Sequence, residues 1–244
     1  MRPAPFIGTA GWALPPDLRI GRQGTSGLAR YAELFNAVEV NTTHYKYHME
    51  RTFTRWRNEV PADFRFAVKM HRQVTHVERL CRPDSALAFL RSIEGLGEKL
   101  GVVLIQLPPS LAFSEVVEES LRIMRNEYTG ALVVEPRHPS WAAGEVEHLL
   151  RQQRMGRVAA DPPLLQDELM PGGDAAVRYY RLHGSPQMYR SVYTDERLAS
   201  IAGSIRDYAS DSAAVWIMFD NTASGHAQAN ALRIRREFEV LDTV

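Results

Sequence analysis

The sequence predicts an α/β fold in which parallel strands and helices alternate and close into a TIM-type (β/α)8 barrel. Three observations support this prediction: a length of 244 residues, eight short apolar runs, and charged or amide residues at the ends of most runs. Strands buried on both faces are apolar throughout, so polar residues gathered where strands stop indicate a shared site at one barrel mouth. We therefore expect one barrel domain over residues 1–244.

The eight apolar runs are the predicted strands. They begin roughly 20 to 40 residues apart, which leaves room for a helix in nearly every interval, as parallel connections require. The chain has no glycine-rich dinucleotide fingerprint, and this favours a closed barrel over an open doubly wound sheet. The predicted strands are residues 5–9, 37–41, 64–69, 102–107, 131–135, 157–161, 177–183 and 215–220.

Helical periodicity appears between the strands. Apolar residues recur at helical spacing after Thr194 and after Ser114, whose hydroxyl groups can cap a helix N-terminus. Further helices are expected to open at Asp84 and to cover residues 223–240. The interval 162–176 differs, because its prolines and its glycine pair oppose helix formation. An irregular segment is expected there in place of a regular sixth helix.

Charge and cysteine content restrict the partners and the compartment. The chain carries 29 basic and 29 acidic residues, so no overall field attracts it to nucleic acid or to a membrane. The lone Cys81 can form no intrachain disulfide, and the start MRPAPFIGTA lacks the apolar stretch of a signal peptide. We expect a cytoplasmic protein that acts on a small molecule, with nucleic acid disfavoured as a partner and no membrane contact.

Seven ordered strings of residues carry a resemblance to a known family. They are GTAGW at 8–12, VEVNTTHY at 38–45, FRFAVK at 64–69, QLPPSL at 106–111, EPRHPSW at 135–141, YYRLHG at 179–184 and FDNTASGHAQANA at 219–231. Together they resemble the YecE-like family, which is also named domain of unknown function 72. The resemblance implies a TIM-type barrel and an unknown activity. The chain departs from the family pattern at His44 and at Met70-His71, so the resemblance implies no role for either histidine.

Alternation along the strands predicts which side chains meet, because residues i and i+2 share one face. The predicted strands end in acids, bases and amides, which would gather at one mouth if these faces point inward. Such a set could bind a polar ligand and carry out acid–base chemistry, or could pair into a structural ring that seals the barrel. The residues expected to converge are Glu39, Asn41, Lys69, Gln106, Glu135, Arg137, Asp161, Arg181, His183 and Asn221.

Lys69 is the most informative single residue. Only Lys46, Lys69 and Lys99 are lysines among 29 basic residues, so the chain uses arginine almost wherever it needs a positive charge. Arginine does not lose its proton in proteins, whereas a desolvated lysine can act as a base or nucleophile. The alternative is a structural ion pair between Lys69 and Glu39.

Two further groups of residues are predicted to bind the substrate. Aromatic rings after the strands could form the walls of the site, or could simply plug the rim. Loops after the seventh and eighth strands could present backbone N–H groups to an anion, although ordinary helix capping explains the same residues. The predicted substrate-binding residues are Glu39, Asn41, Tyr45, Gln106, Arg137, His138, Trp141, Arg181, Tyr189 and Asn221. The predicted anion-binding residues are Gly184, Ser185, Thr222, Ser224 and Gly225.

Three functions remain open at this point. The first is a metal-independent enzyme for a small, polar, anionic substrate carrying phosphate or carboxylate, with Lys69, Glu135, Asp161 and His183 as catalytic residues. The second is a divalent-metal hydrolase or isomerase that uses Glu135, Asp161, His183 and Asp220 as ligands, which no compact metal-binding signature supports. The third is a non-catalytic binder of a ligand or nucleic acid. The sequence identifies no cofactor and no oligomeric state.

Overall fold

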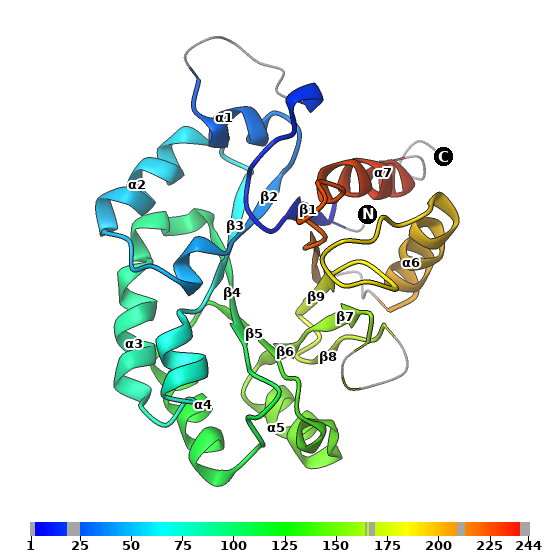
Figure 1. Ribbon diagram of the computed structural model, residues 1–244. Helices are drawn as coiled ribbons and strands as arrows, with labels where there is room; N and C mark the ends of the chain where they lie inside the picture. Colours follow the sequence, from blue (N-terminus) through cyan, green and yellow to red (C-terminus); the bar gives the residue numbers. More distant parts are fainter. Residues whose placement is uncertain (1–2, 19–24, 164, 166–168, 209–212, 240–244) are drawn as a thin grey trace.

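The computed structural model describes residues 3–18, 25–163, 165, 169–208 and 213–239 (Figure 1). Strands and helices alternate through most of this range, as the sequence predicts. The strands are β1 (Phe6–Thr9), β2 (Ala37–Val40), β3 (Arg65–Lys69), β4 (Leu100–Gln106), β5 (Ala131–Glu135), β6 (Met155–Arg157), β7 (Ala159–Asp161), β8 (Gly172–Gly173), β9 (Val177–Leu182) and β10 (Ala214–Phe219). The α-helices are α1 (Gly27–Ala32), α2 (Glu50–Glu59), α3 (Pro83–Ser92), α4 (Glu115–Glu127), α5 (Gly144–Gln152), α6 (Asp195–Tyr208) and α7 (Ala227–Glu239). Short helical turns are η1 (Pro16–Leu18), η2 (Thr42–His44), η3 (Gln73–Val77), η4 (Glu94–Lys99) and η5 (Pro139–Ala142).

The strands form two sheets, and all pairings except one are parallel. One sheet has the order β1-β10-β9-β7, and the other has the order β2-β3-β4-β5-β6-β8, with β8 antiparallel to β6. Two features connect the sheets. A parallel bridge joins Ala10, after β1, to Glu39 of β2, and Val158 alone separates β6 from β7. The predicted α/β class with parallel strands is therefore confirmed, and the single predicted strand 157–161 is divided between the two sheets.

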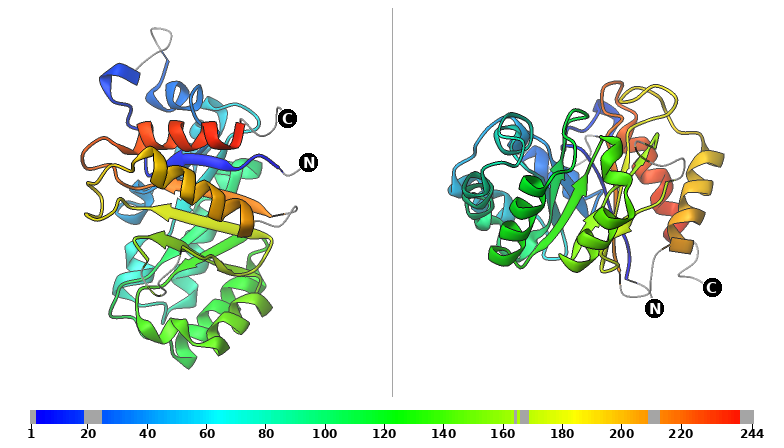
Figure 2. Two further views of the ribbon diagram at one scale, coloured as in Figure 1. Left: turned by 90° about the vertical axis from the view of Figure 1, so that its right-hand side faces the viewer. Right: turned by 90° about the horizontal axis from the view of Figure 1, so that it is seen from below.

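The helices lie outside the strands. Figure 1 shows α2, α3 and α4 beside the β3–β5 side and α6 and α7 beside β9 and β10, and the right-hand view of Figure 2 shows the strands between these two groups. Helix α7 packs against β1 and β10, and it also contacts α6. Parallel strands need such covering helices, because their connections cross over the sheet face.

Side chains on the two faces of the strands form two separate apolar clusters. The larger one joins strand residues such as Leu182 and Ile217 to the covering helices. The smaller one contains no helix residue and consists mainly of alternate strand residues on the other face: Ala37, Ala67, Val102, Leu104, Val133, Val158, Val177, Tyr179, Trp216 and Met218. We call this second face the inner face. Because side chains alternate with a period of two, the next inward positions toward the strand ends are polar.

The segment 162–176 contains no helix in the part that the structure describes. It holds the short strand β8, which pairs with β6 through Gly172 and Gly173. Gly173 has a φ of 66°, and a Cβ there would collide with the carbonyl oxygen of Met155, so only glycine fits. The glycine pair that opposed a helix in the sequence thus permits this close antiparallel contact.

Candidate functional site

A fully buried arginine lies at the centre of the polar inner face. Arg181 of β9 donates from Nε and Nη2 to Glu39 at 3.0 and 2.8 Å. Its Nη1 donates to Glu135 Oε2 at 2.6 Å, and its Nη2 donates to Asp220 Oδ2 at 2.7 Å. The three carboxylates come from the ends of β2 and β5 and from the residue after β10, so one guanidinium joins three strands. We call Glu39, Glu135, Arg181, His183 and Asp220 the Arg181 cluster.

Strand alternation places the cluster. Tyr179, Arg181 and His183 share one face of β9, and the Tyr179 hydroxyl donates to Glu39 Oε2 at 2.8 Å. Glu39 follows the inner residue Ala37 by two positions, and Glu135 follows Val133 in the same way. The structure therefore brings Glu39, Glu135, Arg181 and His183 together.

The charges of the cluster depend on one another. Burial alone would raise the pKa of Glu135, but Arg181, together with His183 and Arg137, holds it well below its usual value. Burial would also lower the pKa of Arg181, which Glu135, Glu39 and Asp220 instead raise well above its usual value. Both groups are thus held in their charged forms, and removing either partner would leave an uncompensated buried charge.

His183 lies between two carboxylates of the cluster. Its Nδ1 is 3.2 Å from Asp220 Oδ2, and its Nε2 is 3.7 Å from Glu135 Oε1. Within the described part of the chain, Nε2 is buried and has no hydrogen-bond partner. Burial and Arg181 act to lower the pKa of His183, but its contacts with Asp220 and Glu135 raise it overall. The ring can therefore take up a proton at a pH where an exposed histidine would have lost it.

The raised pKa of His183 predicts a pH-dependent contribution to stability. A group whose pKa is higher in the folded state stabilises the fold fully below its unfolded pKa, near 6.5, and loses that contribution as pH rises through the folded pKa. Urea unfolding should therefore show a larger difference between wild type and His183→Gln at pH 6 than at pH 9. A difference that grows with pH would mean that the protein holds His183 neutral.

Lys69 ends β3 on the same face and is buried, with 8% of its surface exposed. Among the described residues, its Nζ forms no hydrogen bond and no ion pair, because Glu39 is held by Arg181 and Tyr179 instead. Burial and the nearby Arg181 lower the pKa of Lys69, while Glu39, Glu135 and Asp220 oppose the shift only in part. The structural alternative, a direct Lys69–Glu39 ion pair, is therefore absent from the described residues.

Arg137 and Gln106 occupy neighbouring positions at the strand ends. Arg137 donates from Nε and Nη2 to Glu135 Oε1 at 3.2 and 2.9 Å, and 16% of its side chain remains exposed. Burial acts against the charge of Arg137, but Glu135 and Tyr189 raise its pKa. Gln106 follows the inner residue Leu104 by two positions and is almost buried. Arg137 thus contacts the cluster through Glu135, and Gln106 lies beside Glu135 in the register of β4 and β5.

The structure does not bring Asp161 into the Arg181 cluster, and its predicted place on the inner face is wrong. In the register of β7 and β9, Ala160 lies beside Arg181 and Asp161 lies beside Leu182. Asp161 therefore faces α6, where its Oδ1 accepts a hydrogen bond from Arg197 Nη2 at 2.5 Å. Side chains alternate without a break through this strand: Gly156, Val158 and Ala160 face inward, and Ala159 and Asp161 face the helices. The prediction therefore took the wrong set of alternate residues as the inner one.

Asn221 also has a different role from the predicted one. Its Nδ2 donates to Ser191 O and to Asn230 Oδ1, both at 2.9 Å, so it ties the loop after β9 to α7. The inward position belongs to Asp220, which follows the inner residue Met218 by two positions. From the sequence, Asp220 is a candidate only as a ligand in the metal-dependent alternative, and Tyr179 is not among the predicted site residues. Counting alternate residues from Trp216 would have identified Asp220.

The predicted aromatic walls fall into two classes. Trp141 is buried, donates from Nε1 to Leu111 O at 2.9 Å and packs on Phe113, and His138 caps η5 by accepting from Ser140 N. Both therefore support the loop structure. Tyr189 lies with its ring 5.4 Å from that of His183, whereas Tyr45 is 70% exposed. Of these residues, Tyr189 is the one that contacts the cluster.

In the loops predicted to bind an anion, two backbone N–H groups already donate hydrogen bonds within the protein. Gly184 N donates to the Tyr193 hydroxyl at 2.9 Å, and Gly225 N donates to Thr222 O at 3.1 Å. Four of the five N–H groups of Arg181 donate to carboxylates. Because Arg181 is occupied in this way, Lys69 and Arg137 are the cations best placed to bind an anion.

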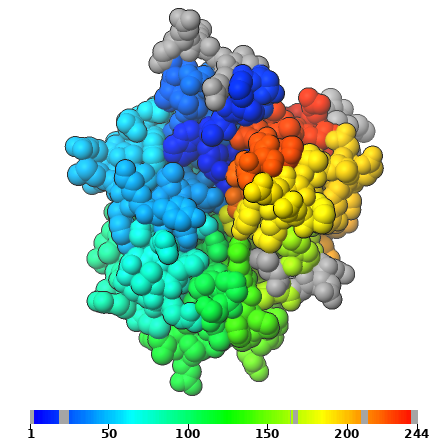
Figure 3. Space-filling view, in the orientation of Figure 1, coloured from blue at the N-terminus to red at the C-terminus, as the bar shows by residue number. Residues whose placement is uncertain are grey.

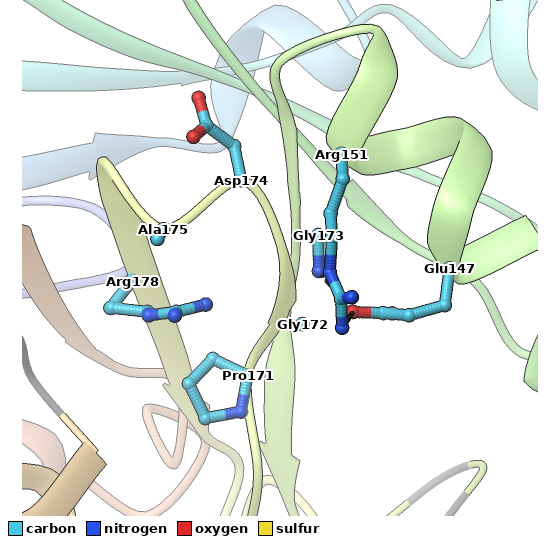
Figure 4. Close-up of a pocket in the computed structure, with 8 residues that line it drawn as sticks. All are labelled: Glu147, Arg151, Pro171, Gly172, Gly173, Asp174, Ala175 and Arg178. Atoms are coloured by element: carbon cyan, nitrogen blue, oxygen red, sulfur yellow. Dashed lines mark hydrogen bonds and ion pairs between the residues drawn. The ribbon is translucent and has the colours of Figure 1, made fainter. Parts of the chain in front are cut away.

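Three further features of the described residues bear on the function. No group of three His, Cys, Asp or Glu side chains among them is arranged to hold a metal ion. None of the described helices is long and apolar enough to cross a membrane. A pocket of about 390 Å³ lies between α5 and the start of β9, with Arg151 and Arg178 on two sides (Figure 4). This pocket adjoins the amino ends of the strands, away from the Arg181 cluster.

Comparison with known proteins identifies one family. A model described as "Protein of unknown function DUF72" matches residues 6–243. UPF0759 protein YecE of Escherichia coli K12 is 32% identical over 164 residues, which are 64% of this chain and 58% of that protein. The YecE protein of Escherichia coli O157:H7 is 32% identical over 151 residues, covering 60% and 54%. The match thus spans little more than half the length of these relatives.

Solved structures show the same fold. A DUF72 family protein from Thermotoga maritima is 26% identical with a TM-score of 0.80, covering 97% of this chain and 99% of that one. A DUF72 family protein from Enterococcus faecalis is 17% identical with a TM-score of 0.81, covering 96% and 95%. A methyltransferase from Methanosarcina mazei, 9% identical with a TM-score of 0.56 and covering 98% and 95%, resembles the chain in fold alone.

Proposed function

Because this chain belongs to the DUF72 family of proteins of unknown function, we propose its function from its own side chains: metal-independent acid–base catalysis on a small, polar, anionic substrate. The observation that carries the proposal is Lys69, a buried lysine whose amine has no ion pair or hydrogen bond within the described residues, beside three carboxylates that are ion-paired to Arg181. A desolvated amine with a lowered pKa is a competent base or nucleophile near neutral pH.

We further propose that the two sheets close into the predicted (β/α)8 barrel, as one domain over residues 1–244. The Ala10–Glu39 bridge supports closure between β1 and β2. The continuity of β6 and β7 through Val158 supports closure on the other side, because β6 pairs with β5 and β7 pairs with β9. In such a barrel the cluster lies at the carboxyl ends of the strands, where barrel enzymes carry their active sites.

The residues divide into a supporting part and a reacting part. Arg181, Glu39 and Tyr179 are buried and mutually satisfied, so they hold the strand ends in place. Lys69 would take a proton from the substrate or attack it, and His183, with its raised pKa and unpartnered Nε2, would return a proton. Arg137, which keeps its charge, would bind the phosphate or carboxylate of the substrate beside Lys69.

The two other functions have less support. A divalent cation would need Glu135 and Asp220, but Arg181 already donates to both, and Lys69 and Arg137 would repel the ion. A non-catalytic binder of nucleic acid would gain little from a chain with zero net charge. For Asp161, which faces away from the cluster, we propose a structural contact with Arg197 in place of the predicted catalytic role.

The test is competitive labelling of the three lysines with acetic anhydride across pH 6 to 11, followed by mass spectrometry. Lys46 is exposed and serves as the internal reference. We expect Lys69 to reach half of its maximal reactivity at a lower pH than Lys46, because burial and Arg181 oppose its charge. Millimolar phosphate at fixed ionic strength should protect Lys69 and leave Lys46 unchanged. A Lys69 that titrates with Lys46, or that phosphate does not protect, would contradict the proposal.

A further inference from the structure

An uncharged pocket opens beside the Arg181 cluster. It has a volume of about 610 Å³ and lies between the segment after β1, the end of β2 and the start of α7. Figure 3 shows the dark blue segment that follows β1 against the orange segment that follows β10. The lining residues that matter here are Trp12, Leu14, Asn41, Thr222, Gly225 and Gln228. No charged side chain of the described residues lines this pocket.

Gln228 supplies the observation that points to a ligand. It lies in the first turn of α7 and is only 5% exposed. Its Nε2 donates to Ala13 O at 2.6 Å, which fixes the amide orientation and makes Oε1 an acceptor. Among the described residues nothing donates to this buried oxygen, and Asn41 Oδ1 on the opposite wall is also buried without a partner. A buried acceptor without a donor lowers the stability of the fold, so we expect a ligand to supply a hydrogen-bond donor to both oxygens.

The pocket therefore combines two features that select one class of ligand. Asn41, Thr222 and Gln228 line it, and among the described residues the oxygens of both amides have no hydrogen-bond donor. Trp12, Leu14 and Pro15 give it an apolar wall against which the C–H face of a ring can pack. An anion would meet two unpaired oxygens and no cation, so a charged group does not fit. A neutral, hydroxyl-bearing ring fits both features.

We propose that this pocket binds a neutral sugar ring, with its hydroxyl groups on Gln228 Oε1 and Asn41 Oδ1. Asn41 follows Glu39 by two positions on β2 and its extension, so the ring would lie next to the Arg181 cluster. The substrate would then be a sugar that carries an anionic group, with the ring in this pocket and the anion near Lys69. That last step rests on the proposed function; the binding of the ring does not.

The experiment uses D-glucose and D-ribose as probes and saturation-transfer difference NMR with the full chain. At least one of these sugars should bind wild type with a millimolar Kd. Thr222→Trp places a large ring at an exposed rim position and should abolish the signal, whereas Ala223→Trp, one residue away and outside the pocket, should keep it. Gln228→Met removes the acceptor and should raise Kd at least tenfold. Inorganic phosphate should give the same protection of Lys69 in all three variants.

The outcomes separate the two proposals. Lys69→Met should bind the sugar as wild type does, because the pocket contains no part of Lys69. Absence of sugar binding to wild type would mean that the pocket holds water only and would overturn the inference. Sugar binding that survives Thr222→Trp and Gln228→Met unchanged would overturn it as well. If sugar binds as expected but Lys69 titrates like Lys46, the proposed chemistry fails and the sugar pocket stands.

Discussion

Replacing Arg181 with methionine should lower the free energy of unfolding by about 3–5 kcal/mol, the range typical for breaking a buried ion pair from one side. Methionine replaces the aliphatic part of the arginine side chain, so the change removes mainly the guanidinium and its charge. Glu39 and Glu135 would be left almost without solvent and without their main countercharge. Urea unfolding at pH 7, followed by circular dichroism, measures the change.

The matched control is Arg122→Met. Arg122 forms an exposed ion pair with Glu118 at 2.6 Å on the surface of α4, and such pairs contribute less than about 1 kcal/mol. The control should therefore unfold close to wild type. If Arg181→Met also lost less than about 1 kcal/mol, the carboxylates would have to take up protons at little cost, and Arg181 would have no supporting role in the cluster.

Regular strands were predictable because their apolar runs are continuous. The prediction 131–135 coincides with β5, and 64–69 differs from β3 by one residue. The sixth strand was predicted as one run, because no residue type marks Val158 as the point where the chain leaves one sheet and joins the other. Hydrophobicity reports burial and not which face of a strand points inward. Because Ala159, Ala160 and Asp161 are all buried, the sequence did not show that Asp161 faces the helices.

Side chains of the candidate site were predictable where the strands that hold them were predictable. Alternation on β9 placed Arg181 and His183 together, and strand ends supplied Glu39 and Glu135. The sequence could not indicate that four of the five N–H groups of Arg181 donate to carboxylates. Those contacts depend on the distances between neighbouring strand ends. The roles of Trp141 and Asn221 depend on loop paths, which no periodic pattern encodes.

Under the proposed function, the Arg181 cluster is a structural ring and the neighbouring Lys69 is the reacting group, so the two alternatives that the sequence left open are combined. A ring needs every partner satisfied, and Arg181 with Glu39 and Tyr179 meets that condition. Lys69 does not, since no described residue pairs with its amine although it is nearly as buried. An unsatisfied buried amine costs stability, and such a cost is expected at a working site. The variants of these two residues should therefore behave in opposite ways.

Lys69→Met should leave the free energy of unfolding unchanged or raise it, because it removes a buried charge that has no partner among the described residues. In a screen of phosphorylated and carboxylated sugars, the same variant should lower any turnover found with wild type by about 10²- to 10⁴-fold, the usual contribution of a general acid or base. Lys69→Arg is the sharper control. It keeps the positive charge for binding but does not release a proton, so turnover should stay low while the substrate still binds. Full turnover by Lys69→Arg would reduce Lys69 to an anion-binding residue, and a loss of several kcal/mol in Lys69→Met would make it a structural one.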